Sequence, residues 1–68
     1  MSYKIPSLGE QIRQYRLYKG ISQEDLAKAI QISQNSLSLI EDGLATPLHN
    51  KITAIEAFLE VELVRDAK

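Results

Sequence analysis

The sequence predicts an all-α fold, a compact four- to five-helix bundle that forms one small domain of 68 residues. Three observations predict it. Apolar residues recur three to four positions apart in four separate stretches, which is the spacing of one face of a helix. Serine precedes three of these stretches, where its hydroxyl can cap the first turn. Glycine follows two of them, where helices commonly end.

The chain is expected to begin with a short N-terminal arm, residues 1–6, followed by the folded domain of residues 7–68. Pro6 disfavours a helical conformation at Ile5, so the first helix is expected after it, over residues 7–19. Two interpretations of the arm stay open: it is a frayed terminus, or it reaches into a groove of a binding partner.

Ser7 and Glu10 have the spacing of a capping box at the start of the first helix. Gly20 is expected to end this helix. Its buried stripe is predicted to consist of Leu8, Ile12 and Tyr15, with the Tyr15 hydroxyl either paired or reaching the surface.

Two short helices are predicted next, over residues 23–30 and 34–42, with Ser22 and Ser33 as their N-caps. Their buried positions are predicted to be Leu26, Ala27 and Ile30 in the first and Leu37 and Ile40 in the second. The small side chain of Ala27 allows two crossing helices to approach closely.

The turn between these two helices is expected to place Ile32 at the corner, where its side chain fills the space between them. If this turn requires a positive φ, Gln31 carries a cost of roughly 1 kcal/mol. Gly43 is expected to end the second of the two helices.

A fourth helix is predicted over residues 48–59, because apolar residues again recur at helical spacing. Its core face is predicted to consist of Leu48, Ile52, Ile55, Phe58 and Leu59. Glu60 is not a residue that stops a helix, so we allow for a short extension through residues 61–66. His49 is expected to be a partly buried helix residue and not a ligand.

Charge and composition exclude several classes of function. The net charge is −1 and the pI about 5.7, and the acidic residues gather toward the C-terminus. With no cysteine, neither a disulfide nor a thiolate metal site can form, which suits a cytoplasmic protein. No apolar run approaches the length of a membrane span. One histidine and no clustered carboxylates facing a pocket predict no catalytic or metal site, and no cofactor is expected.

The helix predicted over residues 34–42 has an unusual outward face. Gln34, Asn35, Ser36 and Ser38 lie between its apolar positions. A structural helix more often carries Glu and Lys there, so these neutral, hydrogen-bonding side chains indicate a recognition surface.

The chain resembles the helix-turn-helix proteins of the phage repressor and Cro type, the xenobiotic-response-element family, over residues 8–63. The residues that carry the resemblance are Leu8, Gly9, Glu10, Ile12, Arg13, Arg16, Gly20, Ile21, Ser22, Gln23, Glu24, Leu26, Ala27, Ile32, Ser33, Gln34, Leu37, Ser38, Ile40, Glu41, Gly43 and Pro47. Each is weak alone, but their order and spacing are specific. The resemblance implies a sequence-specific transcriptional regulator of double-stranded DNA, of repressor, controller or antitoxin type, with helix 34–42 in the major groove.

The resemblance implies that bases are contacted by Gln34, Asn35 and Ser36, with Ser38 and Leu39 about one turn further on. Glutamine and asparagine can each offer adenine one donor and one acceptor. Leu39 either touches a thymine methyl group or is a half-buried neighbour of the core.

The resemblance also implies phosphate contacts. Gln23 is expected to hold a phosphate and to brace the recognition helix, with Ser22 beside it. Arg13, Lys19 and Lys28 are weaker candidates, and Lys28 has Glu24 four residues before it as an alternative partner.

Two structural features complete the resemblance. Arg16 is expected to grip Glu41 with two hydrogen bonds. The C-terminal apolar residues are expected to join two subunits into a homodimer that binds a near-palindromic operator. The interface residues are predicted to be Val61, Leu63 and Val64, with Leu44 as a possible addition. Leu44 is either a contact with the other subunit or a loop residue that packs back on the domain. A toxin or another protein is a further candidate partner.

The alternative is a protein-interaction module of the same fold that has lost DNA binding. The acidic balance favours this alternative, as does the loop of residues 43–47, which contains no basic residue and follows Asp42. The polar face of helix 34–42 argues against it, because a protein-binding groove is usually more apolar.

Overall fold

The structure, a computed structural model, describes residues 6–64 of the chain. Four helices make up the fold: α1 (Leu8–Tyr18), α2 (Gln23–Ala29), α3 (Gln34–Glu41) and α4 (His49–Leu59). The described residues contain no strand, so the predicted all-α bundle is confirmed with four helices. None of these helices is long and apolar enough to cross a membrane. The predicted arm lies outside the described residues except for Pro6.

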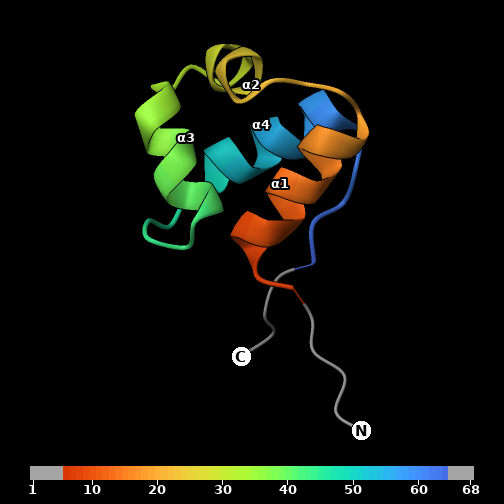
Figure 1. Ribbon diagram of the computed structural model, residues 1–68. Coiled ribbons are helices and arrows are strands. Elements are labelled where there is room, and N and C mark those ends of the chain that lie inside the picture. The colour runs from red at the N-terminus through yellow and green to blue at the C-terminus, as the bar shows by residue number, and fades with distance from the viewer. Residues whose placement is uncertain (1–5, 65–68) are drawn as a thin grey trace, which may run out of the picture.

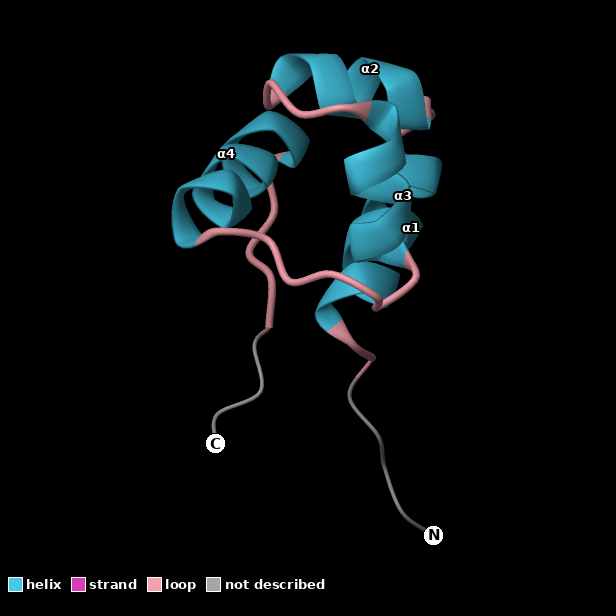
Figure 2. Cartoon of the chain, turned by 90° about the vertical axis from the view of Figure 1, so that its left-hand side faces the viewer, coloured by secondary structure: helices cyan, strands magenta, loops and turns pink. Residues whose placement is uncertain are grey.

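The helices are arranged with α2 across one end of the other three (Figures 1 and 2). The first and last described residues lie close together on the side of the molecule away from α2 (Figure 1), where Gln11 donates to the carbonyl oxygens of both Pro6 and Val64. α3 lies at one edge of the molecule in Figure 1, and it packs against α2 and α1.

Serine side chains start three of the four helices, as predicted. The Ser7 hydroxyl accepts from the Glu10 amide at 3.2 Å while Glu10 accepts from the Ser7 amide at 3.1 Å, which completes the capping box. Ser22 accepts from the Asp25 amide and Ser33 from the Ser36 amide, each at 3.0 Å. These bonds satisfy amides that would otherwise lack a partner in the first turn.

The hydrophobic core draws on all four helices and on the C-terminal segment. Its members are Ile12, Leu26, Ala27, Ile30, Leu37, Ile40, Ile52, Ile55, Leu59 and Leu63. Three predicted core residues are on the surface instead: Tyr15, Leu48 and Phe58 are 36%, 70% and 45% exposed. Leu48 is exposed because it is the N-cap of α4, so it precedes the helical face to which it was assigned.

The backbones of α1 and α3 lie in close contact at Gly9, a position that the sequence reasoning assigned no packing role. A Cβ atom at Gly9 would collide with the carbonyl oxygen of Ile40 and come within 2.8 Å of that of Glu41. Since both obstacles are backbone atoms, no side-chain rotation could relieve the contact. Glycine here allows the two helices to lie in contact.

Positive φ angles end or join the helices at four places. Gln31 in the turn between α2 and α3 has φ 62°. This is the positive φ that was expected to destabilise the turn by roughly 1 kcal/mol at a residue other than glycine. Gly20 and Gly43 have φ 71° and 80° after α1 and α3. Glu60 has φ 59° and ends α4 in the left-handed conformation.

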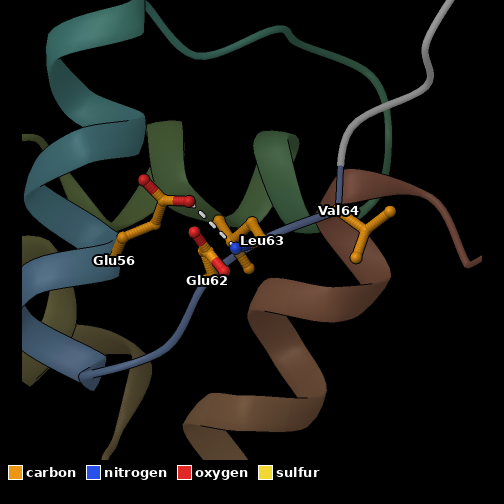
Figure 3. A pocket seen from close by; sticks show the side chains of 4 residues that line it. All are labelled: Glu56, Glu62, Leu63 and Val64. Atoms are coloured by element: carbon orange, nitrogen blue, oxygen red, sulfur yellow. Dashed lines mark hydrogen bonds between the residues drawn. The ribbon is translucent and has the colours of Figure 1, made fainter.

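The helical extension allowed for residues 61–66 is wrong for residues 61–64, which form no helix; residues 65–66 lie outside the described range. Tertiary contacts hold this segment in a different conformation. Leu63 is buried, and its amide donates to Glu56 Oε2 at 2.9 Å (Figure 3). The Gln11 side chain accepts from the Val64 amide at 2.8 Å and donates to its carbonyl at 2.6 Å. Together these contacts fix the segment against α1 and α4.

Candidate nucleic-acid interface

The turn between α2 and α3 sets the angle at which α3 is presented. The Ile32 amide donates to the Ala27 carbonyl at 3.0 Å, and the Gln31 amide donates to the Lys28 carbonyl at 3.2 Å. The half-buried Ile32 side chain packs against the core between the two helices, as predicted. The turn thus leaves the start of α3 at the surface.

The outward face of α3 is polar and uncharged. Gln34, Asn35 and Ser36 are exposed, whereas Ser38 is half-buried. Leu39 is 38% exposed, so its side chain is accessible to a ligand. The opposite face buries Leu37, Ile40 and Glu41. The five residues predicted to contact bases therefore lie on α3 away from its buried face, with Ser38 the least accessible.

The predicted pair between Arg16 and Glu41 forms in the interior. Arg16 Nε and Nη2 donate to the two carboxylate oxygens of Glu41 at 2.8 and 3.0 Å. The Arg16 side chain is 9% exposed and the Glu41 side chain 0%. Arg16 Nη1 also donates to the Ile21 carbonyl at 3.0 Å. This two-point contact fastens the C-terminal end of α3 to α1.

Gln23 connects this ion pair to the exposed start of α3. Its amide nitrogen donates to Glu41 Oε1 at 3.2 Å, and its amide oxygen accepts from Gln34 Nε2 at 3.3 Å. Because the nitrogen faces the carboxylate, the oxygen must face Gln34. A chain of hydrogen bonds therefore runs from Arg16 to Gln34, which supports the bracing role expected of Gln23.

Gln34 retains bonding capacity toward solvent. Its amide group has two N–H donors and one carbonyl oxygen, and one donor is used by Gln23. The other N–H donor and the carbonyl oxygen of this exposed side chain can form two hydrogen bonds with one planar group that offers an acceptor and a donor side by side.

The cationic side chains predicted to contact phosphates differ in whether a carboxylate of the protein already pairs with them. Arg13 Nη2 lies 2.7 Å from Asp42 Oδ1 and its Nε 3.5 Å from Glu41 Oε1. The hydrogen bond that Arg13 donates to Asp42, followed by the one it donates to Glu41, raises the pKa of Arg13 above its ordinary value. Lys28 lies 3.6 Å from Glu24, the alternative partner named above. Among residues 6–64, Lys19 is exposed and makes no ion pair.

Lys51 has a structural role that the sequence reasoning missed. Its ammonium group donates to the Ile30 carbonyl at 2.8 Å, so a side chain of α4 caps the C-terminal end of α2. A cation is favourable there, because unpaired carbonyl groups give that end of a helix a partial negative charge. No sequence signal pointed to it, since the contact joins residues that are 21 positions apart.

The four residues predicted for a dimer interface separate into two groups. Leu44 and Val64 are 75% and 53% exposed. Val61 is half-buried, and Leu63 is 6% exposed and belongs to the core of the chain itself. The prediction that Leu63 contacts another subunit needs correction, because its side chain is not on the surface.

Gln11 is a buried polar residue that the sequence reasoning also missed. It is 6% exposed and binds the backbone of Pro6 and Val64. Its position three residues after Leu8, beside the apolar stripe of α1, was the available signal for its burial.

A surface hollow beside the C-terminal segment is lined by Glu56, Glu62, Leu63 and Val64 (Figure 3). Within the described part of the chain, no group of three or more potential ligands could hold a metal ion.

Comparison with known proteins agrees with this geometry. A family model described as a helix-turn-helix domain matches residues 7–65. A search of curated proteins gave no significant match. One similar solved structure is SinR of Bacillus subtilis, the master regulator for biofilm formation, in complex with DNA. It is 36% identical, with 81% of this chain and 89% of that chain covered and a TM-score of 0.74.

Two further similar structures are regulators of other kinds. The P22 c2 repressor in complex with a synthetic operator is 26% identical, with 85% of this chain and 88% of that chain covered and a TM-score of 0.79. The restriction–modification controller protein C.AhdI from Aeromonas hydrophila is 27% identical, with 81% and 83% covered and a TM-score of 0.76.

Proposed function

The chain belongs to the helix-turn-helix domain family, and from this premise we propose that it is a sequence-specific, double-stranded DNA-binding transcriptional regulator. α3 enters the major groove and presents its first turn to base edges. One observation carries the proposal: an exposed, neutral first turn of α3 is held by a hydrogen-bond chain that starts at the buried Arg16–Glu41 pair.

Base reading starts at Gln34 and Asn35. Gln34 keeps one donor and its acceptor free after bonding Gln23, which matches the acceptor and donor that adenine shows in the major groove. Asn35 is exposed beside it and has the same chemistry. Ser36, Ser38 and Leu39 contact neighbouring positions, Leu39 through a thymine methyl group. The similarity to SinR bound to DNA and to P22 c2 bound to an operator supports this assignment.

Backbone contacts position α3 on the duplex. Ser22 and Gln23 stand at the start of α2, and Lys19 is an exposed cation shortly before them. These three are the proposed phosphate contacts that need no rearrangement. Arg13 and Lys28 need to leave their carboxylate partners before they can contact a phosphate.

Two copies bind a near-palindromic operator as a homodimer, because a two-fold dimer presents the same α3 to each half-site. The exposed Leu44 and Val64 contact the partner subunit, with the half-buried Val61 behind them. Leu63 supports this surface from inside the protomer. Leu48, 70% exposed, is added to the proposed interface because it lies in the loop that contains Leu44.

The regulator acts by occupying its operator, which blocks or recruits polymerase, and it works in the cytoplasm as a repressor, a controller or an antitoxin. A protein partner is also proposed. This proposal is supported by the similarity to a chain in the structure of the SinR protein/SinI protein complex, at 36% identity over 81% of this chain and 54% of that chain. A toxin is the partner expected for the antitoxin form of the proposal.

A selection experiment tests the proposed function. Duplexes bound by the protein are enriched from a random pool, and affinity for the enriched site and for a scrambled duplex is then measured at two salt concentrations. The proposal predicts a clear preference for the enriched site. Equal affinity for both duplexes would contradict it and would favour the protein-interaction module.

A further inference from the structure

Acidic side chains form ion pairs with most of the cationic side chains that could contact DNA phosphates. Residues 6–64 contain five cationic side chains: Arg13, Arg16, Lys19, Lys28 and Lys51. Arg16 is committed to the buried pair with Glu41, and Lys51 caps α2. Arg13 and Lys28 are at the surface, but each has a carboxylate partner. Of these five, only Lys19 has neither a carboxylate partner nor a capping contact.

We propose that Asp42 and Glu24 are specificity-determining residues, because they compete with DNA phosphates for Arg13 and Lys28. The inference rests on the proposed function and adds to it how the protein suppresses binding to non-cognate DNA. Asp42 is the stronger competitor. Its carboxylate lies 2.7 Å from Arg13, whereas the Glu24–Lys28 separation is 3.6 Å and both side chains are more than half exposed.

The competition works even where the ion pair is weak. A cation that leaves its carboxylate for a phosphate leaves an uncompensated anion close to the DNA. The net neutralisation of the phosphates is then small, so few counterions are released from the duplex. Affinity gained through counterion release is independent of sequence, whereas hydrogen bonds from α3 to base edges depend on sequence. Withholding two cations therefore lowers non-specific affinity and spares the reading of bases.

The position of Asp42 fits this role. It directly follows α3 and precedes a loop, residues 43–48, that contains no cation. Arg13 comes from α1, so the pair joins two elements at the edge of the proposed interface. A neutral residue at position 42 would leave Arg13 with only the longer contact of 3.5 Å to Glu41.

The experiment compares four variants, each of which removes one negative charge. Asp42→Asn and Glu24→Gln release a cation. Asp25→Asn neutralises the neighbour of Glu24 on the same exposed turn without breaking an ion pair, and Glu62→Gln does so far along the chain. Circular dichroism first verifies that all four fold as the wild type does. Binding constants are then measured over a range of salt concentrations with a scrambled duplex and with the enriched site.

The inference predicts that Asp42→Asn steepens the dependence of log K on log salt by about 0.9 per protomer on the scrambled duplex. Glu24→Gln steepens it by a smaller amount, and the two controls leave the slope near that of the wild type. In both releasing variants the affinity for scrambled DNA rises more than that for the enriched site, so the preference falls.

Unchanged slopes for Asp42→Asn and Glu24→Gln, or equal steepening by Asp25→Asn, overturn the inference. Failure of the proposed function gives a different result. In that case the wild type shows no preferred site, while the slopes on scrambled DNA still report whether the two carboxylates withhold cations.

Discussion

At the scale of single residues, Glu41 organises the proposed interface. Its side chain is 0% exposed and receives hydrogen bonds from Arg16, Arg13 and Gln23. These donors come from α1 and α2, whereas Glu41 is the last residue of α3. One carboxylate thus joins three helices. Because it is buried, its charge is tolerated only with these donors in place.

Glu41→Ala is therefore expected to lower the free energy of unfolding by about 3–5 kcal/mol, because Arg16 would be left buried without its partner. Urea unfolding followed by circular dichroism measures the change. Glu62→Ala removes an exposed acid and serves as the control, with an expected change within about 0.5 kcal/mol. Unfolding of Glu41→Ala at the wild-type urea concentration would show that the pair contributes no more than a surface contact.

Sequence reasoning succeeded at this scale where the resemblance supplied long-range pairs. The contact between Arg16 and Glu41 was predicted from it, although 25 residues separate them. The bonds of Gln11 to Val64 and of Lys51 to Ile30 were not predicted. Such pairings between distant residues follow from how the helices pack, and local spacing does not encode them.

At the scale of elements, the close approach of α1 and α3 depends on Gly9. Replacing glycine by alanine within a helix normally stabilises it by about 0.5–1 kcal/mol, because glycine has more freedom to lose. Here the added Cβ atom would press on two backbone carbonyl groups of α3. The steric cost opposes the helical gain, and backbone atoms can yield little.

Gly9→Ala is expected to lower the free energy of unfolding by about 1–3 kcal/mol, the cost of overpacking a close contact. Urea unfolding again measures it. The matched control is Gln14→Ala, an exposed position of the same helix where alanine should have little effect. A stabilised Gly9→Ala protein would mean that the two helices can separate without cost.

The helices themselves could be predicted almost completely from local signals. Three serine caps were assigned correctly, because capping depends on residues within one turn. The end of α4 at Leu59 was predicted as well, but the short helical extension allowed after it does not form over residues 61–64. Glu60 adopts φ 59° there, and the burial of Leu63 and its bond to Glu56 hold the following segment in a non-helical path. Tertiary contacts overrode local preference at this point.

At the scale of the whole molecule, the small size of the domain is one reason to propose association with a second copy. A domain of this length buries a limited apolar surface, and Leu44, Leu48 and Val64 each remain at least half exposed. Their exposure is the reason to expect a partner subunit.

Sedimentation equilibrium tests the proposed dimer. The protein is expected to be dimeric at high micromolar concentration, and Leu44→Asp or Val64→Asp should shift it toward monomer by placing a charge in an apolar interface. Thr53→Asp changes an exposed residue of α4 outside the proposed interface and should leave the dimer intact. A monomer under all conditions, with or without the enriched duplex, would contradict the proposed assembly.

We propose that α3 reads bases, and the substitution Gln34→Ala tests this role. Affinity is measured for the enriched site and for the scrambled duplex, with Gln14→Ala as a control that makes the same change on the exposed face of α1. We predict a loss of about 1–3 kcal/mol, roughly 5- to 150-fold, for the enriched site and no loss for the scrambled one. If Gln34→Ala binds both duplexes as the wild type does, α3 does not read the sequence and the account is contradicted.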